Sequence, residues 1–181
     1  KIIQKRKNIC GLKFDNTKLI GILNMTPDSF SDGGLFFDEL NANNQISKML
    51  KGGATVIDVG GESTRPGSKT LTVNEEWSRI KNVISKFKKK FPKVILSLDT
   101  RKSEIMKKGI DSGVDIINDV SGFKFDKRSF NVVKSKKIPL ILHHMQGTPE
   151  TMQQNPTYDD VLVEIFDFFE SKINFFSKKG Y

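Results

Sequence analysis

The sequence predicts an α/β fold in which a parallel sheet is built from successive strand–helix units. Short apolar or β-branched runs alternate five times with longer stretches whose apolar residues recur every three or four positions. Such repetition implies helices packed outside a parallel sheet, which is either an open doubly wound sheet or a barrel. Neither GxGxxG nor GxxxxGK[ST] follows the first strand, so a dinucleotide site and a P-loop are both disfavoured.

The first two units lie in the N-terminal half of the chain. An apolar run over 19–23 predicts a strand, 39–51 a helix, and the β-branched segment 54–59 the next strand. Thr72 and Glu75 have the spacing of a capping box, which predicts that a second helix begins there. One face of that helix is expected to carry Trp77, Ile80, Ile84, Phe87 and Phe91.

The remaining three units follow without a linker. Strands are predicted over 94–98, 114–117 and 138–143, and helices over 103–109, 127–136 and 158–178. The last helix is expected to present one apolar face, formed by Leu162, Ile165, Phe169, Ile173 and Phe176.

Composition points to a soluble, cytoplasmic protein. No run approaches the roughly 20 apolar residues that span a bilayer, no secretory signal is recognisable, and a single cysteine, Cys10, fits a reducing compartment. The net charge of +9 comes mostly from Lys on helix-like stretches, which suits solvated helix faces better than a nucleic-acid surface. No nucleic-acid or membrane partner is therefore expected, whereas an anionic small substrate is favoured.

Polar residues gather where each predicted strand stops. The five strand ends carry Asn24, the glycine-rich segment 60–67, Asp99 with Thr100, Asn118 with Asp119, and His143 with His144. Taken singly, each Asp or Asn is better explained as a helix cap. Five consecutive polar strand ends favour one shared pocket, because the carboxyl ends of parallel strands face the same way.

The chemistry available at these strand ends suits binding more than covalent catalysis. No nucleophile–base pair is evident, and two adjacent histidines in a strand would point to opposite faces, which argues against a two-His metal site. Asn, Asp and Thr, Arg65 and glycine-rich turns remain. They suit a polar heterocycle and a phosphate group, with catalysis by positioning and electrostatics.

Several segments resemble the dihydropteroate synthase family. They are GILNMTPDSFSDGG (21–34), GATVIDVGGESTRPGS (53–68), LDTRK, DIINDVSG and HHMQGTPETMQ, in that order, and the similarity runs from about Ile20 to the end. The resemblance implies a pterin-binding TIM (β/α)8 barrel that acts in folate biosynthesis and is the target of sulfonamides. It further implies a homodimer that joins a dihydropterin-methyl diphosphate to 4-aminobenzoate and releases diphosphate.

The resemblance also implies roles for individual residues. Asp99 and Asn118 match ligands of the pterin ring, and Thr64 and Arg65 match groups near the diphosphate. Asn24 matches a ligand of Mg²⁺, the implied cofactor, which commonly takes few protein ligands and several phosphate or water oxygens.

Three loop residues match the aminobenzoate side of the reaction. Phe30 and Pro66 match residues that cradle its ring, and Asp32 matches a residue that closes near the reacting carbon, so no acid or base is assigned beyond Asp32 as a candidate. Asp58, Glu62 and Asp119 are expected to support these groups or to cap turns, and His144 to be structural.

Two residues depart from the family pattern. Arg101 follows Asp-Thr where another residue is usual, and could alter the pocket rim, while His143 replaces a more usual Met.

A complete barrel needs eight units and about 250 residues, whereas only five are recognisable here. Residues 1–181 are therefore expected to form one barrel domain that is incomplete at its C-terminus and inactive alone. Two alternatives remain open: a pterin-binding methyltransferase domain with the same barrel, and a non-catalytic paralogue.

Overall fold

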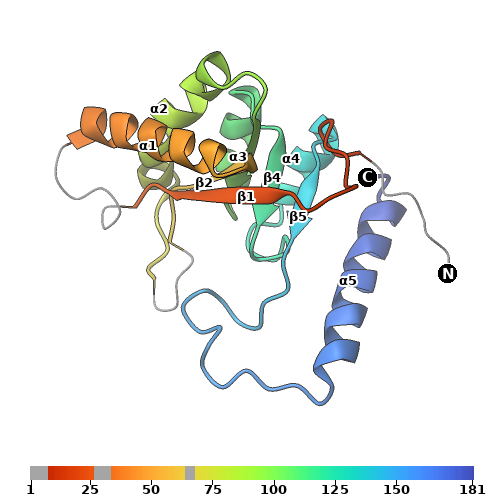
Figure 1. Cartoon of the computed structure of the whole chain (residues 1–181). Coiled ribbons are helices and arrows are strands. Elements are labelled where there is room, and N and C mark those ends of the chain that lie inside the picture. Colours follow the sequence, from red (N-terminus) through yellow and green to blue (C-terminus); the bar gives the residue numbers. More distant parts are fainter. Residues whose placement is uncertain (1–7, 27–33, 64–67) are drawn as a thin grey trace.

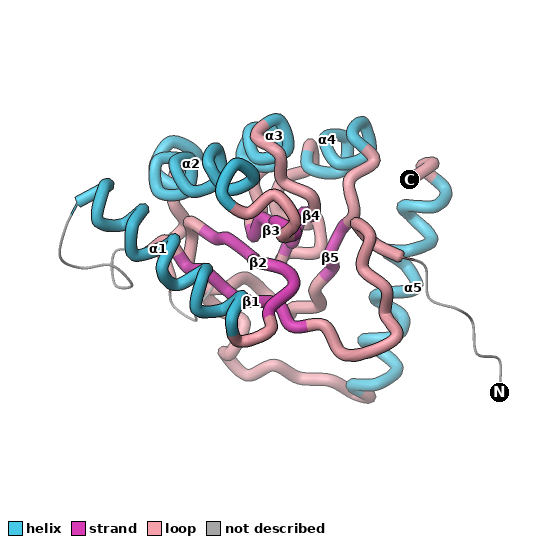
Figure 2. The backbone as a smooth tube through the Cα atoms, turned by 45° about the horizontal axis from the view of Figure 1, so that its top comes forward, coloured by secondary structure: helices cyan, strands magenta, loops and turns pink. Residues whose placement is uncertain are grey.

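The computed structural model describes residues 8–26, 34–63 and 68–181, which form five strands that alternate with five helices (Figure 1). The elements are β1 (Leu19–Asn24), α1 (Gly34–Lys51), β2 (Ala54–Gly60), α2 (Val73–Lys90), β3 (Ile95–Asp99), α3 (Ser103–Asp111), β4 (Ile116–Asp119), α4 (Ser129–Lys136), β5 (Leu140–Leu142) and α5 (Val161–Lys178). Helices α1 to α4 cover one face of the sheet, and α5 stands apart after a long connection (Figure 2). The predicted order of strands and helices is confirmed.

All neighbouring strands of the sheet are parallel and follow the order of the chain, β1-β2-β3-β4-β5. Asn24 pairs with Gly60, Gly60 with Asp99, and Asp99 with Asn118. The last residues of β1, β2 and β3 therefore lie in one row with Asn118 of β4. This register turns four separate positions in the sequence into one edge of the sheet.

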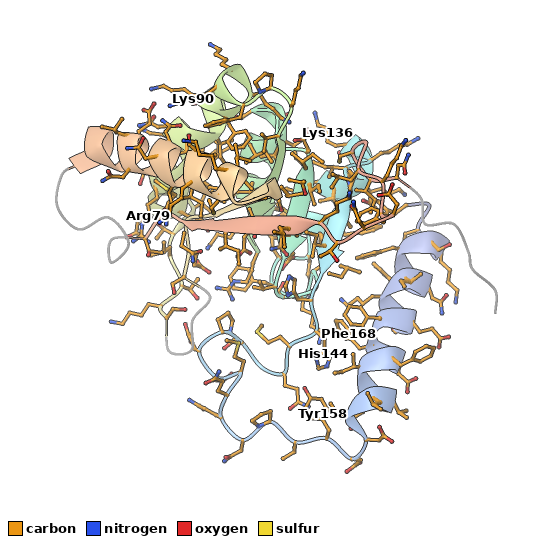
Figure 3. The ribbon with its side chains drawn as sticks, viewed as in Figure 1. Arg79, Lys90, Lys136, His144, Tyr158 and Phe168 are labelled. Atoms are coloured by element: carbon orange, nitrogen blue, oxygen red, sulfur yellow. The ribbon has the colours of Figure 1, made fainter. Side chains whose placement is uncertain are left out.

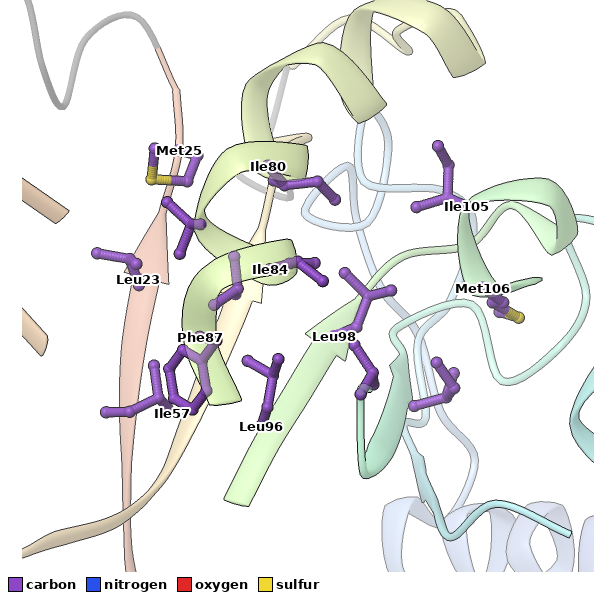
Figure 4. Packing of buried hydrophobic residues seen from close by; sticks show 14 of the residues in the cluster. Leu23, Met25, Ile57, Ile80, Ile84, Phe87, Leu96, Leu98, Ile105 and Met106 are labelled. Carbon is purple, nitrogen blue, oxygen red and sulfur yellow. The ribbon is translucent and has the colours of Figure 1, made fainter. Parts of the chain in front are cut away.

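Side chains alternate between the two faces of the sheet, as the two-residue period of a strand requires. One face packs under the helices, where Ile57, Leu96 and Leu98 meet Ile84 and Phe87 of α2 (Figure 4). On the other face a small apolar cluster holds the fully or nearly buried side chains of Val56, Ile95 and Ile116. Nearer to the strand ends this second face becomes polar.

Local signals explain why α2 begins where it does. Thr72 accepts a hydrogen bond from the backbone N–H of Glu75, and the Glu75 carboxylate accepts one from the backbone N–H of Thr72. This reciprocal pair is the predicted capping box, and it satisfies donors that a helix start otherwise leaves unpaired. The boundaries of other elements shift slightly: β4 begins at Ile116 rather than 114, and β5 ends at Leu142 before the histidines.

The predicted apolar face of α5 is wrong at two positions. Leu162 and Ile173 are 78% and 61% exposed. The helix contacts the rest of the chain through Phe176, which was predicted to lie on this face, and through Phe168 and Lys172, which lie two turns and one turn before it. Phe176 stacks on Phe130 with ring centroids 5.1 Å apart, and the Lys172 ammonium donates to the Gly122 carbonyl. No helix among the described residues is long and apolar enough to cross a membrane.

Candidate functional site

The row of strand ends brings together three of the predicted site residues. Gly60 lies between Asn24 and Asp99 and has no side chain to separate them. A Cβ atom added at Gly60 would lie 3.6 Å from Asp99 Oδ2 and 3.8 Å from Asn24 Oδ1. The glycine thus leaves the two polar side chains facing the same space above the end of β2.

A chain of hydrogen bonds crosses the sheet from β2 to the residue after β5. The Asn118 amide Nδ2 donates to Asp58 Oδ2 at 2.9 Å, and His143 Nε2 lies 2.8 Å from Asn118 Oδ1. Asp58 and Asn118 are buried, whereas His143 is exposed. The strand-end amide is therefore held from both sides.

Three buried polar atoms on this face lack a hydrogen-bond partner among the residues that the structure describes. They are Asp58 Oδ1, Asp99 Oδ1 and the hydroxyl oxygen of Ser97. An ionised carboxylate can accept hydrogen bonds but cannot donate them. Leaving a buried acceptor unpaired costs roughly 1–3 kcal/mol. A ligand with several N–H donors would satisfy these oxygens.

Burial also disfavours the ionised form of the two carboxylates. Desolvation raises the pKa of Asp99 well above its usual range, and the neighbouring charges of Asp58, Asp119 and Glu76 raise it further, while Arg101 lowers it. Desolvation likewise raises the pKa of Asp58, against the effect of Ser97, Asn118 and His143. Strongly shifted carboxyl groups in a shared concavity are typical of functional sites.

A buried ionic cluster, formed by Glu62, Glu76, Arg101 and Lys102, lies beside Asp99. Lys102 Nζ contacts both Glu62 and Glu76, the latter at 2.6 Å, and Arg101 Nε donates to Glu62 Oε1 at 3.1 Å. Burial raises the pKa of Glu62, but the hydrogen bonds from Lys102 and Arg101 outweigh this and lower it. The cluster therefore connects the end of β2 to the β3–α3 turn.

Arg101 is not a free rim cation, although it was expected to affect the rim. It is buried, is paired with Glu62 and lies over the Phe125 ring, with 4.3 Å between the guanidinium carbon and the ring centroid. It also lines a hollow of about 270 Å³ together with Lys124, Met145 and Thr148. The positive side chains beside this hollow suit an anionic ligand.

The supporting carboxylates and His144 have distinct positions. Asp119 accepts hydrogen bonds from the backbone N–H of Ser121 and Phe123, as expected of a turn cap. His144 packs between β5 and α5, with its ring 5.0 Å from Phe168 and 5.9 Å from Tyr158 (Figure 3). The two histidines thus have different neighbours. Among the residues that the structure describes, no group of three His, Cys, Asp or Glu could hold a metal ion.

Five predicted site residues lie outside the described residues: Phe30, Asp32, Thr64, Arg65 and Pro66. Asn24, Asp99 and Asn118 are brought together. From the sequence, Gly60 was placed at a strand end only as part of the segment 60–67, Ser97 was not assigned to the site, and Asp58 and His143 were given no defined contact. Position in the strand was an available signal, because Asp58 and Ser97 lie two residues before Gly60 and Asp99 and so share their face.

Comparison with known proteins identifies the family. A family model described as "Pterin binding enzyme" matches residues 20–181. The chain belongs to the pterin-binding enzyme family.

Two relatives named dihydropteroate synthase match most of this chain. The chain is 39% identical over 158 residues to a Synechocystis dihydropteroate synthase and 40% identical over 162 residues to that of Escherichia coli. These matches cover 87% and 90% of this chain but 54% and 57% of the two relatives. The chain thus spans just over half the length of the curated relatives it matches.

Solved structures agree with the fold. A Yersinia pestis dihydropteroate synthase with a sulfonamide drug complex matches with a TM-score of 0.85 and 37% identity, covering 93% of this chain and 61% of that one. A Xanthomonas albilineans dihydropteroate synthase with 4-aminobenzoic acid matches at 0.83 and 35%, covering 93% and 59%. The five-stranded parallel sheet thus corresponds to part of a TIM barrel, as the family resemblance implied.

Proposed function

We propose that the protein carrying this chain is a dihydropteroate synthase, which condenses (7,8-dihydropterin-6-yl)methyl diphosphate with 4-aminobenzoate to give 7,8-dihydropteroate and diphosphate. The observation that carries this proposal is the unpartnered, buried Oδ1 of Asp99, which lies beside Asn118 at the strand ends. The names of the relatives support the same reaction.

Asp99 and Asn118 have the chemistry to bind the pterin ring. A carboxylate accepts two parallel N–H bonds from a 2-amino-pyrimidinone edge, and an amide offers both a donor and an acceptor. The acceptor-rich face formed by Asp58, Ser97 and Asp99 suits a heterocycle whose edge is rich in N–H donors. The same burial that makes these carboxylates costly to ionise strengthens hydrogen bonds to a ligand.

We propose that Thr64 and Arg65 bind the diphosphate and that Asn24 contributes one amide oxygen to Mg²⁺. Asn24 fits this role because its Oδ1 faces the same space as Asp99 and because Mg²⁺ commonly takes few protein ligands. When bound, Mg²⁺ neutralises charge on the diphosphate. The C–O bond at the pterin methylene then breaks, the aryl amine forms the new C–N bond there, and its proton passes to water.

Phe30 and Pro66 are proposed to hold the aminobenzoate ring, and Asp32 to lie near the reacting carbon. Sulfonamides are aryl amines shaped like 4-aminobenzoate, so substitutions at Phe30 or Pro66 should change sulfonamide inhibition more than pterin binding. A panel of such variants with unchanged inhibition constants would contradict this assignment.

The reaction is tested by measuring diphosphate release by the full-length protein with each substrate alone and with both together. Release that requires 4-aminobenzoate and yields dihydropteroate supports the proposal. A methyltransferase domain would instead move a folate methyl group to a corrinoid partner, and a non-catalytic paralogue would bind the pterin without turnover.

Further expectations belong to the same proposal. The protein is proposed to act in the cytoplasm as a homodimer, without a nucleic-acid or membrane partner. Light scattering of the full-length protein after size-exclusion chromatography tests the dimer, and a monomeric mass would contradict it.

A further inference from the structure

The amide of Asn118 is held by Asp58 and His143, and the proposed function gives neither of these two contacts a role. Asp58 contacts its nitrogen and His143 its oxygen, at 2.9 and 2.8 Å. Asp58 and Asn118 are only 6% and 8% exposed. His143 stands where the family resemblance has a more usual Met, a side chain without an N–H donor for the amide oxygen.

These contacts fix both the amide and the imidazole. The Asn118 NH₂ faces Asp58, because its Nδ2 donates a hydrogen bond to Asp58 Oδ2. The amide oxygen then faces His143, and because that oxygen only accepts, Nε2 must carry the proton. One carboxylate thus decides which way the amide points and which imidazole tautomer can face it.

We propose that Asp58 and His143 are positioning residues that hold the Asn118 amide in one orientation toward the pterin ring, an inference that rests on the proposed function. In this arrangement one Nδ2–H and one Oδ1 lone pair stay free for the ligand. A Met at position 143 would remove the donor and leave Oδ1 without this partner. Gln at that position would keep an N–H donor of similar reach.

The first test is calorimetric titration of 7,8-dihydropterin into the full-length protein and two variants. His143→Met should weaken binding about three- to tenfold, the equivalent of one hydrogen bond, whereas His143→Gln should stay within about twofold of wild type. The KM for 4-aminobenzoate should not change in either variant. Because His143 is exposed, neither substitution should prevent folding.

A double-mutant cycle tests whether the effect acts through Asn118. In an Asn118→Ala background, His143→Met should cause no further loss of dihydropterin affinity. Nitrogen-15 spectra of the imidazole should show the Nε2–H tautomer in wild type, and this signature should persist in Glu104→Gln, an exposed control.

Three results would overturn the inference. The first is equal dihydropterin affinity in wild type and His143→Met. The second is an undiminished effect of His143→Met in the Asn118→Ala background, and the third is a wild-type His143 imidazole with its proton on Nδ1. These outcomes differ from failure of the proposed function, which shows as wild-type protein that releases no diphosphate. A protein with the tautomer and the affinity loss but without diphosphate release would keep the positioning roles and reject the reaction.

Discussion

Asp99 is a residue whose burial disfavours the ionised form of its carboxyl group and for which we propose a role in binding. Its Oδ1 is buried without a partner among the described residues, and desolvation raises the pKa of its carboxyl well above the usual range. The folded state therefore holds the Asp99 proton more tightly than the unfolded state does. The stabilisation that accompanies this proton is complete below the unfolded pKa and is lost as pH rises through the folded pKa.

Asp99→Asn should consequently raise stability while it lowers affinity. The variant has no carboxyl group whose ionisation burial opposes, so its melting temperature at neutral pH should rise, by about 2–4 °C for each kcal/mol gained. Dihydropterin binding should weaken strongly, because one of two acceptors becomes a mismatched donor. Differential scanning calorimetry and titration calorimetry of the full-length protein measure the two effects.

Two results for Asp99→Asn would contradict these expectations, one in affinity and one in thermal stability. Unchanged dihydropterin affinity would remove Asp99 from the site. A melting temperature of Asp99→Asn that lies below that of wild type, and further below it at pH 7 than at pH 4, would show that the ionised carboxylate stabilises the fold. That is the opposite of the expected effect.

Asn24→Ala should separate the diphosphate from the ring. Asn24 is assigned to the metal and diphosphate, so the variant should lose more affinity for the pterin-methyl diphosphate with Mg²⁺ than for bare dihydropterin. Gly60 lies between Asn24 and Asp99, so the two side chains face the same space from neighbouring positions. Asn24 can therefore bind the metal and diphosphate while Asp99 binds the ring. Equal losses for the two ligands in titration calorimetry would refute the assignment.

At this scale the sequence was informative about residue types and less so about contacts. Asp99 and Asn118 were recognised from strand ends and family resemblance, and the register places them side by side. The hydrogen bonds of the Asn118 amide join it to Asp58, 60 residues away in the chain, and to His143, 25 residues away. No local pattern encodes such distances, so these partners emerge only from the sheet.

At the scale of elements, the ionic cluster fixes the connection after β2 to the turn after β3. Glu62 accepts hydrogen bonds from Arg101 and from the backbone N–H of Leu71, just before α2. Glu76, fully buried on α2, is bonded to Lys102 and to the Thr100 hydroxyl. The segment after β2, helix α2 and the β3–α3 turn therefore contact one another through charged side chains that have few other partners.

Lys102→Met should destabilise the full-length protein by about 3–5 kcal/mol, because it leaves the buried Glu76 carboxylate without its cation. Adding Glu76→Gln should restore much of the loss. Denaturant unfolding measures both. Lys107→Met is the matched control, since Lys107 forms an exposed ion pair with Asp111 one turn away and its loss should leave the unfolding midpoint unchanged. A Lys102→Met midpoint equal to that of the control would contradict the role of the cluster.

Elements were predicted well where a local signal exists and poorly where packing decides. The Thr72 capping box and the α2 apolar face needed only nearby residues. The orientation of α5 depends on Phe123 and Phe130, aromatic residues from the β4–α4 turn and α4 that receive Phe176. Because α5 is apolar on several sides, its sequence alone did not determine which side packs inward.

At the scale of the whole molecule, the described sheet is open between β1 and β5. Ile20 and Ile22 of β1 are 48% and 63% exposed, and Phe166 of α5 is 65% exposed. Open strand edges beside exposed apolar side chains favour association with other chains. The relatives extend well beyond the length matched here.

A polypeptide of residues 1–181 expressed by itself should therefore associate and should not synthesise dihydropteroate. Five parallel strands do not close a barrel of eight, so β1 and β5 remain open edges of the sheet. Size-exclusion chromatography with light scattering and a dihydropteroate assay test this. A monodisperse, active monomer with cooperative unfolding would contradict the prediction.

The sequence predicted the α/β class and the order of strands and helices along the chain, because strand and helix signals alternate and are joined by short connections. It could not by itself decide between an open sheet and a barrel, since both give the same local pattern. That distinction came from the family resemblance and agrees with the solved relatives.

The proposed function requires that the pterin ring bind the strand-end carboxylate oxygens that have no hydrogen-bond partner among the described residues. A crystal structure of the full-length protein with 7,8-dihydropterin would show this contact. We expect ring N–H groups about 2.7–3.2 Å from Asp99 Oδ1, with the Asn118 amide also in contact and still bonded to Asp58. A dihydropterin bound elsewhere, with Asp99 Oδ1 still without a hydrogen-bond donor, would contradict it.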